Sequence, residues 1–150
     1  MGGRGGSSGI SNSTYDKNGL LKNTSEYSGY DANKLSGTQK QKEYAQDIIN
    51  AGFKNIENQI ERIRKEEGKL IESYPERADS IRINANAAIQ SYIDIKKVFV
   101  MSFNGKMNNA GKVIANKDKI KDALSPLRES LEVKYQKQYM DEYKKKHGYK

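Results

Sequence analysis

The stretch from Thr38 to Pro75 constrains the fold most, because it combines a helix start, a long apolar stripe and a helix stop. Thr38 and Gln41 have the spacing of a capping box, in which each side chain satisfies the other's backbone N–H. Pro75 stops a helix at the residue before it. Small or apolar residues recur between them at spacings of three and four, as on one helical face: Ala45, Ile49, Gly52, Ile56, Ile60, Ile63, Leu70 and Tyr74.

The length of this predicted helix raises a packing question. Unbroken from residue 38 to 73, it would measure about 54 Å at 1.5 Å per residue. A compact domain of roughly 110 residues, the chain without its first 36 or so, would be only about 35 Å across. The helix therefore either breaks near Gly52 and Phe53, or protrudes and pairs with another chain as a homodimer. We expect an unbroken or gently kinked helix.

Two further main helices follow from similar signals. Pro75 suits the first position of the second helix, which should end near Phe103 at the Asn104-Gly105 stop. Its predicted face comprises Ala78, Ile81, Ala85, Ala88, Ile89, Tyr92 and Phe99. We expect lower order over residues 107–116 and a short helix over 117–124. Ser125 and Pro126 then open a last helix, in N-cap and first-turn positions, that ends near Lys146. The sequence predicts an all-α fold, a small antiparallel bundle of one long and two further main helices.

The first 36 residues have a different composition. They are rich in Gly, Ser and Asn and hold few aliphatic side chains. Such a stretch buries too little apolar surface to offset the entropy of ordering it. We therefore divide the chain into a flexible arm at 1–36, which Tyr15, Tyr27 and Tyr30 could dock on a partner or on the body, and a helical domain at 37–150.

Composition argues against catalysis. Without cysteine there is no disulfide or thiolate metal site, and the one histidine, His147, lies in the C-terminal tail, where a general base would lack held geometry. The carboxylates of the first helix stand among basic residues, as on a salt-bridged solvent face, although Glu67 falls within the apolar stripe: Glu57, Glu61, Glu66 and Glu67, beside Arg62, Arg64 and Lys65. We expect no cofactor, no metal and no enzyme. Because no apolar run approaches a membrane span of about 20 residues, we expect a soluble cytoplasmic protein.

The charge favours either a binding role, toward a polyanion or an acidic protein surface, or a purely solubilising role for the lysines of a helical protein with a thin core. The net charge is +8, and residues 106–150 hold twelve of the 27 basic and six of the 19 acidic side chains. Leu127, Leu131, Tyr135, Tyr139 and Tyr143 recur every four residues, a row that drifts by about 40° per step around a helix. The first three should bury together, while the last two turn toward solvent among lysines, where they could stack on single-stranded nucleic acid or form a protein hot spot. Packing of these tyrosines on the first helix is the alternative. The candidate partner-binding residues are Lys137, Tyr139, Tyr143, Lys144, Lys145, Lys146 and, in the arm, Arg4.

Three short segments carry a resemblance to known proteins. The opening MGGRGGSSG resembles that of small phage and integrative-element proteins of Gram-positive bacteria. The helix start GTQKQKEYAQDI is similar to a Gly-Thr-x-Lys-Gln-x-x-x-Ala-x-x-Ile start in mobile-element proteins, matched by Gly37, Thr38, Lys40, Gln41, Ala45 and Ile48. Some of those proteins also have a stretch that resembles Tyr92-Ile93-Asp94-Ile95-Lys96.

The resemblance implies a genomic setting and, with it, a class of partner. We expect a phage or mobile-element protein that acts in the cytoplasm of its bacterial host. It would inhibit a host nucleic-acid-targeting defence complex by occupying a binding site, as anti-CRISPR proteins do. A nucleic-acid-binding or packaging accessory is the first alternative, and a protein of phage head assembly is the second.

Overall fold

The computed structural model describes residues 27–148, and within this part three long helices and four short helical segments follow one another. In chain order they are η1 (Ala32–Lys34), α1 (Gln39–Ser73), η2 (Pro75–Arg77), α2 (Ala78–Phe103), α3 (Ala110–Ala115), α4 (Lys117–Lys121) and α5 (Ser125–Lys146). The described extended pairing is one isolated bridge between Ser36 and Asn109. The predicted all-α bundle is confirmed.

Helix α1 begins and ends where the sequence places its signals. The Gln41 N–H donates to Thr38 Oγ1 (3.1 Å), and the Thr38 N–H donates to Gln41 Oε1 (3.0 Å), which completes the capping box. Tyr74, just before Pro75, leaves the helical region at φ −135°. The helix is unbroken over 35 residues, so Gly52 is not a break. A Cβ at Gly52 would lie 2.8 Å from the Ile120 carbonyl oxygen, so glycine is needed there for close packing.

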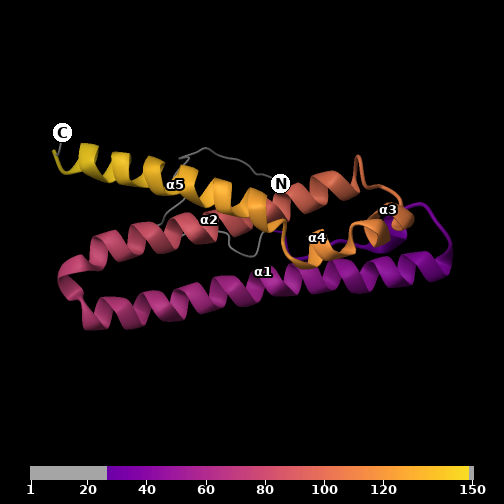
Figure 1. Ribbon diagram of the computed structural model, residues 1–150, viewed down its shortest axis with the longest axis horizontal. Coiled ribbons are helices and arrows are strands. Elements are labelled where there is room, and N and C mark those ends of the chain that lie inside the picture. Colours follow the sequence, from indigo (N-terminus) through magenta and orange to yellow (C-terminus); the bar gives the residue numbers. More distant parts are fainter. Residues whose placement is uncertain (1–26, 149–150) are drawn as a thin grey trace, which may run out of the picture.

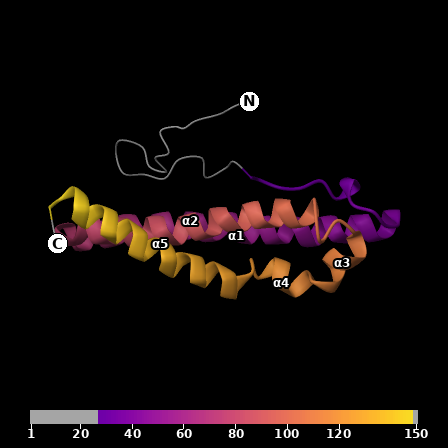
Figure 2. The ribbon, with the colours of Figure 1, turned by 90° about the horizontal axis from the view of Figure 1, so that it is seen from above.

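The long helices share one central element. Helices α1 and α2 form an antiparallel hairpin, α3 and α4 cover the first half of α1, and α5 runs back along α2 (Figures 1 and 2). Helix α5 packs on α2 rather than on α1. The molecule is therefore elongated, and α2 accompanies α1 within the same chain. The length of α1 thus needs no second chain to cover it, and the homodimer through α1 stays a prediction.

The apolar core lies at one end of the hairpin. Ile48, Ile49 and Ile56 of α1 are fully buried against α2, α3 and α4. Three phenylalanines bind the two long helices together, with ring centroids 5.5 Å apart for Phe53 and Phe99 and 5.8 Å apart for Phe99 and Phe103. Farther along the hairpin the buried apolar side chains shrink to a small cluster of Ile89 and Ile93. Buried alanines of α2 and polar contacts hold the remaining part of the hairpin.

The structure moves the boundary of the predicted arm. Residues 1–26, with Arg4 and Tyr15, lie outside the described residues. Residues 27–36, which the composition assigns to the arm, pack on the helices instead, and Ala32 and Leu35 are buried. The Gln46 side chain of α1 holds their backbone, since its Nε2 donates to the Tyr30 carbonyl (2.9 Å) and its Oε1 accepts from the Ala32 N–H (2.8 Å). A few buried contacts and paired backbone groups thus order a segment of low apolar content.

The connection after α2 is more regular than expected. Asn104 ends α2 as the sequence predicts, but α3 forms inside residues 107–116, where we expected lower order. The Asn109 side chain caps its start by accepting from the Lys112 N–H (3.2 Å). Ala110 and Val113 are fully buried. Burial against α1 therefore orders a helix too short to be stable alone.

The junction between α4 and α5 differs from the expected N-cap. Ser125 is the first residue of α5 rather than its cap, and no side chain caps this helix end. The N–H of Leu124 donates to the Lys119 carbonyl and that of Ala123 to the Ile120 carbonyl (both 3.0 Å), the pattern of a Schellman helix end. Both residues are left-handed, with φ 53° at Ala123 and 48° at Leu124. This conformation costs a non-glycine residue about 1–2 kcal/mol.

Candidate binding surface

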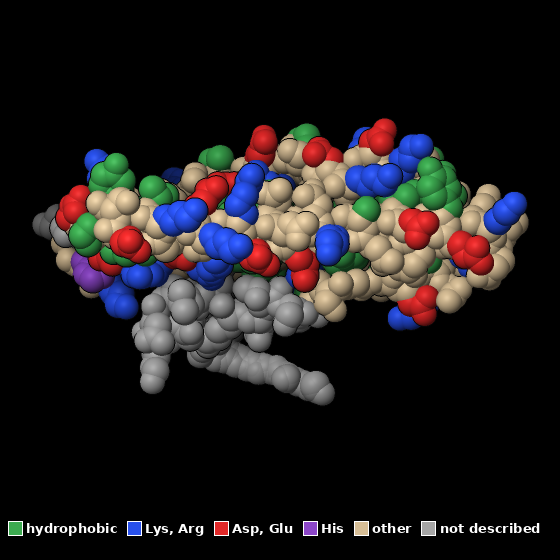
Figure 3. Space-filling model, turned by 90° about the horizontal axis from the view of Figure 1, so that it is seen from below, with side chains coloured by type: hydrophobic (Ala, Val, Ile, Leu, Met, Phe, Trp, Pro, Cys, Tyr) green, Lys and Arg blue, Asp and Glu red, His purple; other side chains and the backbone are tan. Residues whose placement is uncertain are grey.

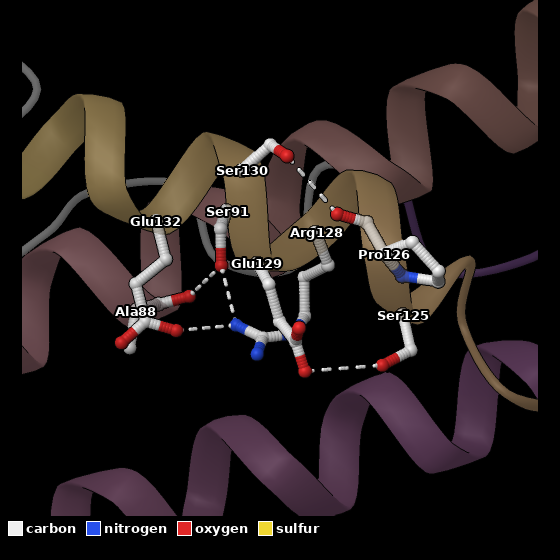
Figure 4. A network of polar contacts seen from close by, with 8 residues as sticks. All are labelled: Ala88, Ser91, Ser125, Pro126, Arg128, Glu129, Ser130 and Glu132. Carbon is white, nitrogen blue, oxygen red and sulfur yellow. Dashed lines mark hydrogen bonds and ion pairs between the residues drawn. The ribbon is translucent and has the colours of Figure 1, made fainter.

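Helix α5 carries most of the predicted binding residues, and polar contacts fix its orientation on α2. Arg128 Nη1 donates to Ser91 Oγ on α2 (3.1 Å) and pairs with Glu132 on its own helix (2.6 Å) (Figure 4). Ser91, which is fully buried, donates in turn to the Ala88 carbonyl (2.5 Å). The guanidinium carbon of Arg128 also lies 4.6 Å from the ring centre of Tyr92, a cation–π distance. Arg128 is thus an anchor and leaves one face of α5 turned outward.

The tyrosines of α5 do not divide as the sequence predicts. Tyr139 is only 6% exposed and stacks on Tyr135, with ring centroids 5.5 Å apart. Tyr143 is half-buried and donates to Asp79 Oδ2 on α2 (2.9 Å). Leu127, which we expected to bury, is 43% exposed. The prediction that Tyr139 turns to solvent and that Leu127 is buried is wrong.

The reason for this correction is the position of the inward face around the helix. The row from Leu127 to Tyr143 turns by about 40° per step, and the bonds of Arg128, Tyr135 and Tyr143 to α2 centre the contact on Tyr135 and Tyr139 rather than on Leu131. Leu127, at one edge of the row, therefore turns toward solvent. The alternative prediction was that these tyrosines pack on the first helix instead of facing solvent. They do pack on a helix, but that helix is α2 and not α1.

Burial and nearby charge keep the two central tyrosines protonated. Burial raises the pKa of Tyr135 well above its usual value, and the hydrogen bond that its hydroxyl donates to Asp94 raises it further. Asp94 Oδ1 also accepts from Gln90 Nε2 (3.0 Å). Burial likewise raises the pKa of Tyr92, and the positive charge of Arg128 offsets part of that rise. The raised pKa values keep both hydroxyls protonated near neutral pH, and that of Tyr135 donates a hydrogen bond to Asp94.

The outward face of α5 is what the structure leaves for a partner. We define it by residues that the helical period places opposite the α2 contact, all exposed: Leu127, Ser130, Val133, Lys134, Lys137, Gln138, Asp141, Lys144 and Lys145. Val133 is 65% exposed. Lys146 is exposed at the end of the helix, and none of Lys137, Lys144, Lys145 and Lys146 forms an ion pair within the described part of the chain.

The basic last third does not form one field. Residues 106–122 lie with α3 and α4 at one end of the molecule, whereas the end of α5 lies at the other, because α5 runs back along α2 (Figure 1). On the side of α1, basic and acidic side chains are interspersed (Figure 3). The one-ended charge in the sequence is therefore spread along the molecule. His147, exposed, lies with its ring centre 4.3 Å from that of Tyr143.

Two buried charged contacts on the hairpin were only partly visible in the sequence. Glu67 is 7% exposed and pairs with Arg64 Nη1 (3.0 Å), which also donates to Asn86 Oδ1 on α2 (3.2 Å). Lys96 is 1% exposed, and its Nζ lies 2.7 Å from Glu57 Oε2. The position of Glu67 in the apolar stripe was the available signal for the first. Only Glu61 and Lys65, 3.5 Å apart and well exposed, form the solvent-facing pair expected of this segment.

Within residues 27–148 no group of three or more His, Cys, Asp or Glu side chains could hold a metal ion. No helix in that range is long and apolar enough to cross a bilayer. The chain matches no protein-family model, no curated protein and no solved structure.

Proposed function

We propose that the protein is a non-enzymatic binding protein that attaches to another protein through the outward face of α5. The observation that carries the proposal is the order of charges along this face. Lys134 and Lys137 form one basic level, Lys144 and Lys145 form a second basic level at the helix end, and Asp141 lies between the two. A partner of the class that the resemblance implies is a host nucleic-acid-targeting defence complex, which the protein would inhibit by covering a site.

Alternating charge supports a protein partner over a nucleic acid. A phosphate backbone is uniformly negative, so Asp141, one helical turn from Lys137 and Lys145, would repel it. A protein surface can offer a matching order of acidic and basic groups, and such complementarity gives specificity and register. Exposed Val133 adds an apolar contact of the kind that protein interfaces bury.

The position of the tyrosines supports the same choice. Single-stranded nucleic acids bind where successive bases stack on exposed rings. Tyr139 is buried under α5, and the Tyr143 hydroxyl is bonded to Asp79. Tyr139 therefore offers no ring face to a base while α5 stays on α2, and Tyr143 is only partly exposed.

The proposal is tested by capture from lysates of the bacterial host, with and without nuclease treatment. The full chain should retain one defined host complex after nuclease treatment. The double variant Lys137→Glu and Lys145→Glu should lose it, because it cancels the net positive charge of both basic levels. Lys119→Glu, an exposed lysine of α4, is the matched control and should retain it.

Each other outcome counts against the proposal in a distinct way. Loss of the captured material on nuclease treatment would indicate the nucleic-acid-binding alternative, whose affinity should also fall steeply with salt. Capture of capsid proteins would indicate the head-assembly alternative. Equal capture by the wild type and the double variant would show that the outward face of α5 is not the binding surface.

A further inference from the structure

The junction between α4 and α5 holds three consecutive residues in unfavourable backbone conformations. Ala123 and Leu124 are left-handed although neither is glycine, a conformation in which Cβ crowds the following carbonyl. Ser125 is helical although it precedes Pro126, and the ring of a proline drives the preceding residue toward extended conformations. The backbone strain at all three residues would be released if this junction became extended.

The side-chain hydrogen bonds described between α5 and other elements run to α2. Arg128 bonds to Ser91, Tyr135 to Asp94 and Tyr143 to Asp79, and each pair joins these two helices alone. Helix α5 packs on α2 rather than on α1. The whole helix could therefore leave as a unit and make the same contacts on the α2 of another molecule.

We propose that the chain forms a domain-swapped dimer, in which α5 packs on α2 of a second copy and residues 123–125 form an extended hinge. The exchange creates no new interface chemistry, since every α2–α5 contact is made twice across a two-fold axis. It releases the strain of both hinges, and short strained hinges favour such exchange. This inference is independent of the proposed function, because the outward face of α5 stays exposed in both forms.

Two terms oppose the exchange and make it depend on concentration. Opening the hinge gives up the backbone hydrogen bonds from Leu124 to Lys119 and from Ala123 to Ile120, and it exposes Ala123, which is 1% exposed in the closed form. Association also costs translational and rotational entropy. The closed monomer should therefore dominate in dilute solution, and the swapped dimer should appear after incubation at high concentration.

The first experiment asks which chain supplies α5. Ile83 of α2 and Met140 of α5 line the same recess, and the chain has no native cysteine, so the double variant Ile83→Cys and Met140→Cys gives an unambiguous cross-link. Monomer and dimer fractions separated by size exclusion with light scattering are treated with a short bismaleimide. The dimer should yield a covalent dimer on a denaturing gel, and the monomer should yield an internal link.

The second experiment changes the hinge strain. Leu124→Gly and Leu124→Ala both remove the side chain, but only glycine accepts a left-handed backbone without strain. Relative to Leu124→Ala, Leu124→Gly should lower the dimer association constant by about tenfold for each of the two hinges. Ala123→Gly should lower it in the same direction. Lys137→Glu, on the outward face, should leave it unchanged.

Three results would overturn the swap. The first is a wild-type protein that stays monomeric at every concentration and also stays so with Leu124→Ala. The second is a dimer whose bismaleimide links all lie within single chains, which would favour pairing through α1. The third is an equal association constant for Leu124→Gly and Leu124→Ala.

Discussion

The two ends of the α1–α2 hairpin are held together by different chemistry. At the end near α3 and α4, fully buried aliphatic and phenylalanine side chains fill the space between helices. Toward the turn at η2, and along α5, the buried apolar side chains are fewer and smaller, and hydrogen bonds such as Arg64–Asn86 and Tyr135–Asp94 join the helices. Close packing of buried side chains stabilises the first end. The second end is stabilised by buried polar groups, each of which needs its hydrogen-bond partner in place.

The difference implies distinct responses to mutation. Truncation at the apolar end leaves a cavity, and no second substitution at a polar group can repair it. At the polar end, loss of one partner strands the other, whereas replacement of both partners by apolar residues removes the cost. The two ends should also open separately, because α5 packs on α2 rather than on the first half of α1.

The largest expected effect is that of Phe99→Ala. Phe99 is fully buried and contacts Phe53 and Phe103, so truncation should lower the free energy of unfolding by about 3–5 kcal/mol. Chemical denaturation followed by circular dichroism measures this. Met101→Ala, also on α2 but 72% exposed, is the control and should change it by less than about 0.5 kcal/mol. Similar losses for both variants would contradict an apolar core at this end.

The next effect should come from Arg64→Leu, and a second substitution should reverse it. The single variant strands the Glu67 carboxylate, whose Oε2 already has no hydrogen-bond partner in the described structure. Because Arg64 is 26% exposed, we expect a loss of about 2 kcal/mol rather than the larger cost of a fully buried pair. Adding Glu67→Leu should restore most of the loss. A double variant less stable than the single one would show that this end, too, depends on shape more than on pairing.

A smaller and local effect is expected for Tyr135→Phe. The variant removes a hydrogen bond to a carboxylate, worth about 1–2 kcal/mol, and leaves Asp94 with Gln90 as its remaining side-chain partner at Oδ1. Hydrogen exchange should show faster exchange across α5 and unchanged protection at Ile49 and Phe99. Uniformly faster exchange along the whole chain would mean that the two ends unfold as one unit.

The smallest effect should be the response to alkaline pH. The pKa of Tyr135 is raised in the folded chain, so above its ordinary value of about 10 the unfolded chain loses a proton that the folded chain keeps. Stability should therefore be constant from neutral pH to about pH 10 and fall as the pH rises further. The fall should be shallower in Tyr135→Phe. An identical alkaline slope in both proteins would assign the effect to other groups.

The sequence predicts the elements of this fold whose signals are local. The capping box, Pro75 and Asn104 place three ends of the long helices within a residue or two because each acts through its nearest neighbours. Helix α3 escaped prediction because it owes its order to burial of Ala110 and Val113 against α1, a contact distant in sequence. Ser125 looked like an N-cap, but the left-handed Ala123 and Leu124 shift the helix start by one residue.

The candidate surface was predicted less well, for a geometric reason. The lysines at 137 and 144–146 are exposed as expected, since charge alone places them in solvent. The tyrosines were misassigned because a periodic row has no fixed phase until the packing partner is known. In the sequence, nothing separates Arg128 from an ordinary surface arginine. Its role as the anchor of α5 is visible only in the structure, from its contacts with Ser91 and Tyr92.

The two hydrogen bonds between the Gln46 side chain and the backbone have a consequence for which sequences residues 27–36 can tolerate. The Gln46 amide bonds to the carbonyl of Tyr30 and the N–H of Ala32, groups that every residue except proline supplies. These two hydrogen bonds therefore depend on the spacing of the backbone groups and not on the identity of the side chains. Many substitutions at residue 31 would leave them intact, whereas a one-residue insertion or deletion there would move a different pair of peptide groups into reach of Gln46 and shift the burial of Ala32 and Leu35 with them.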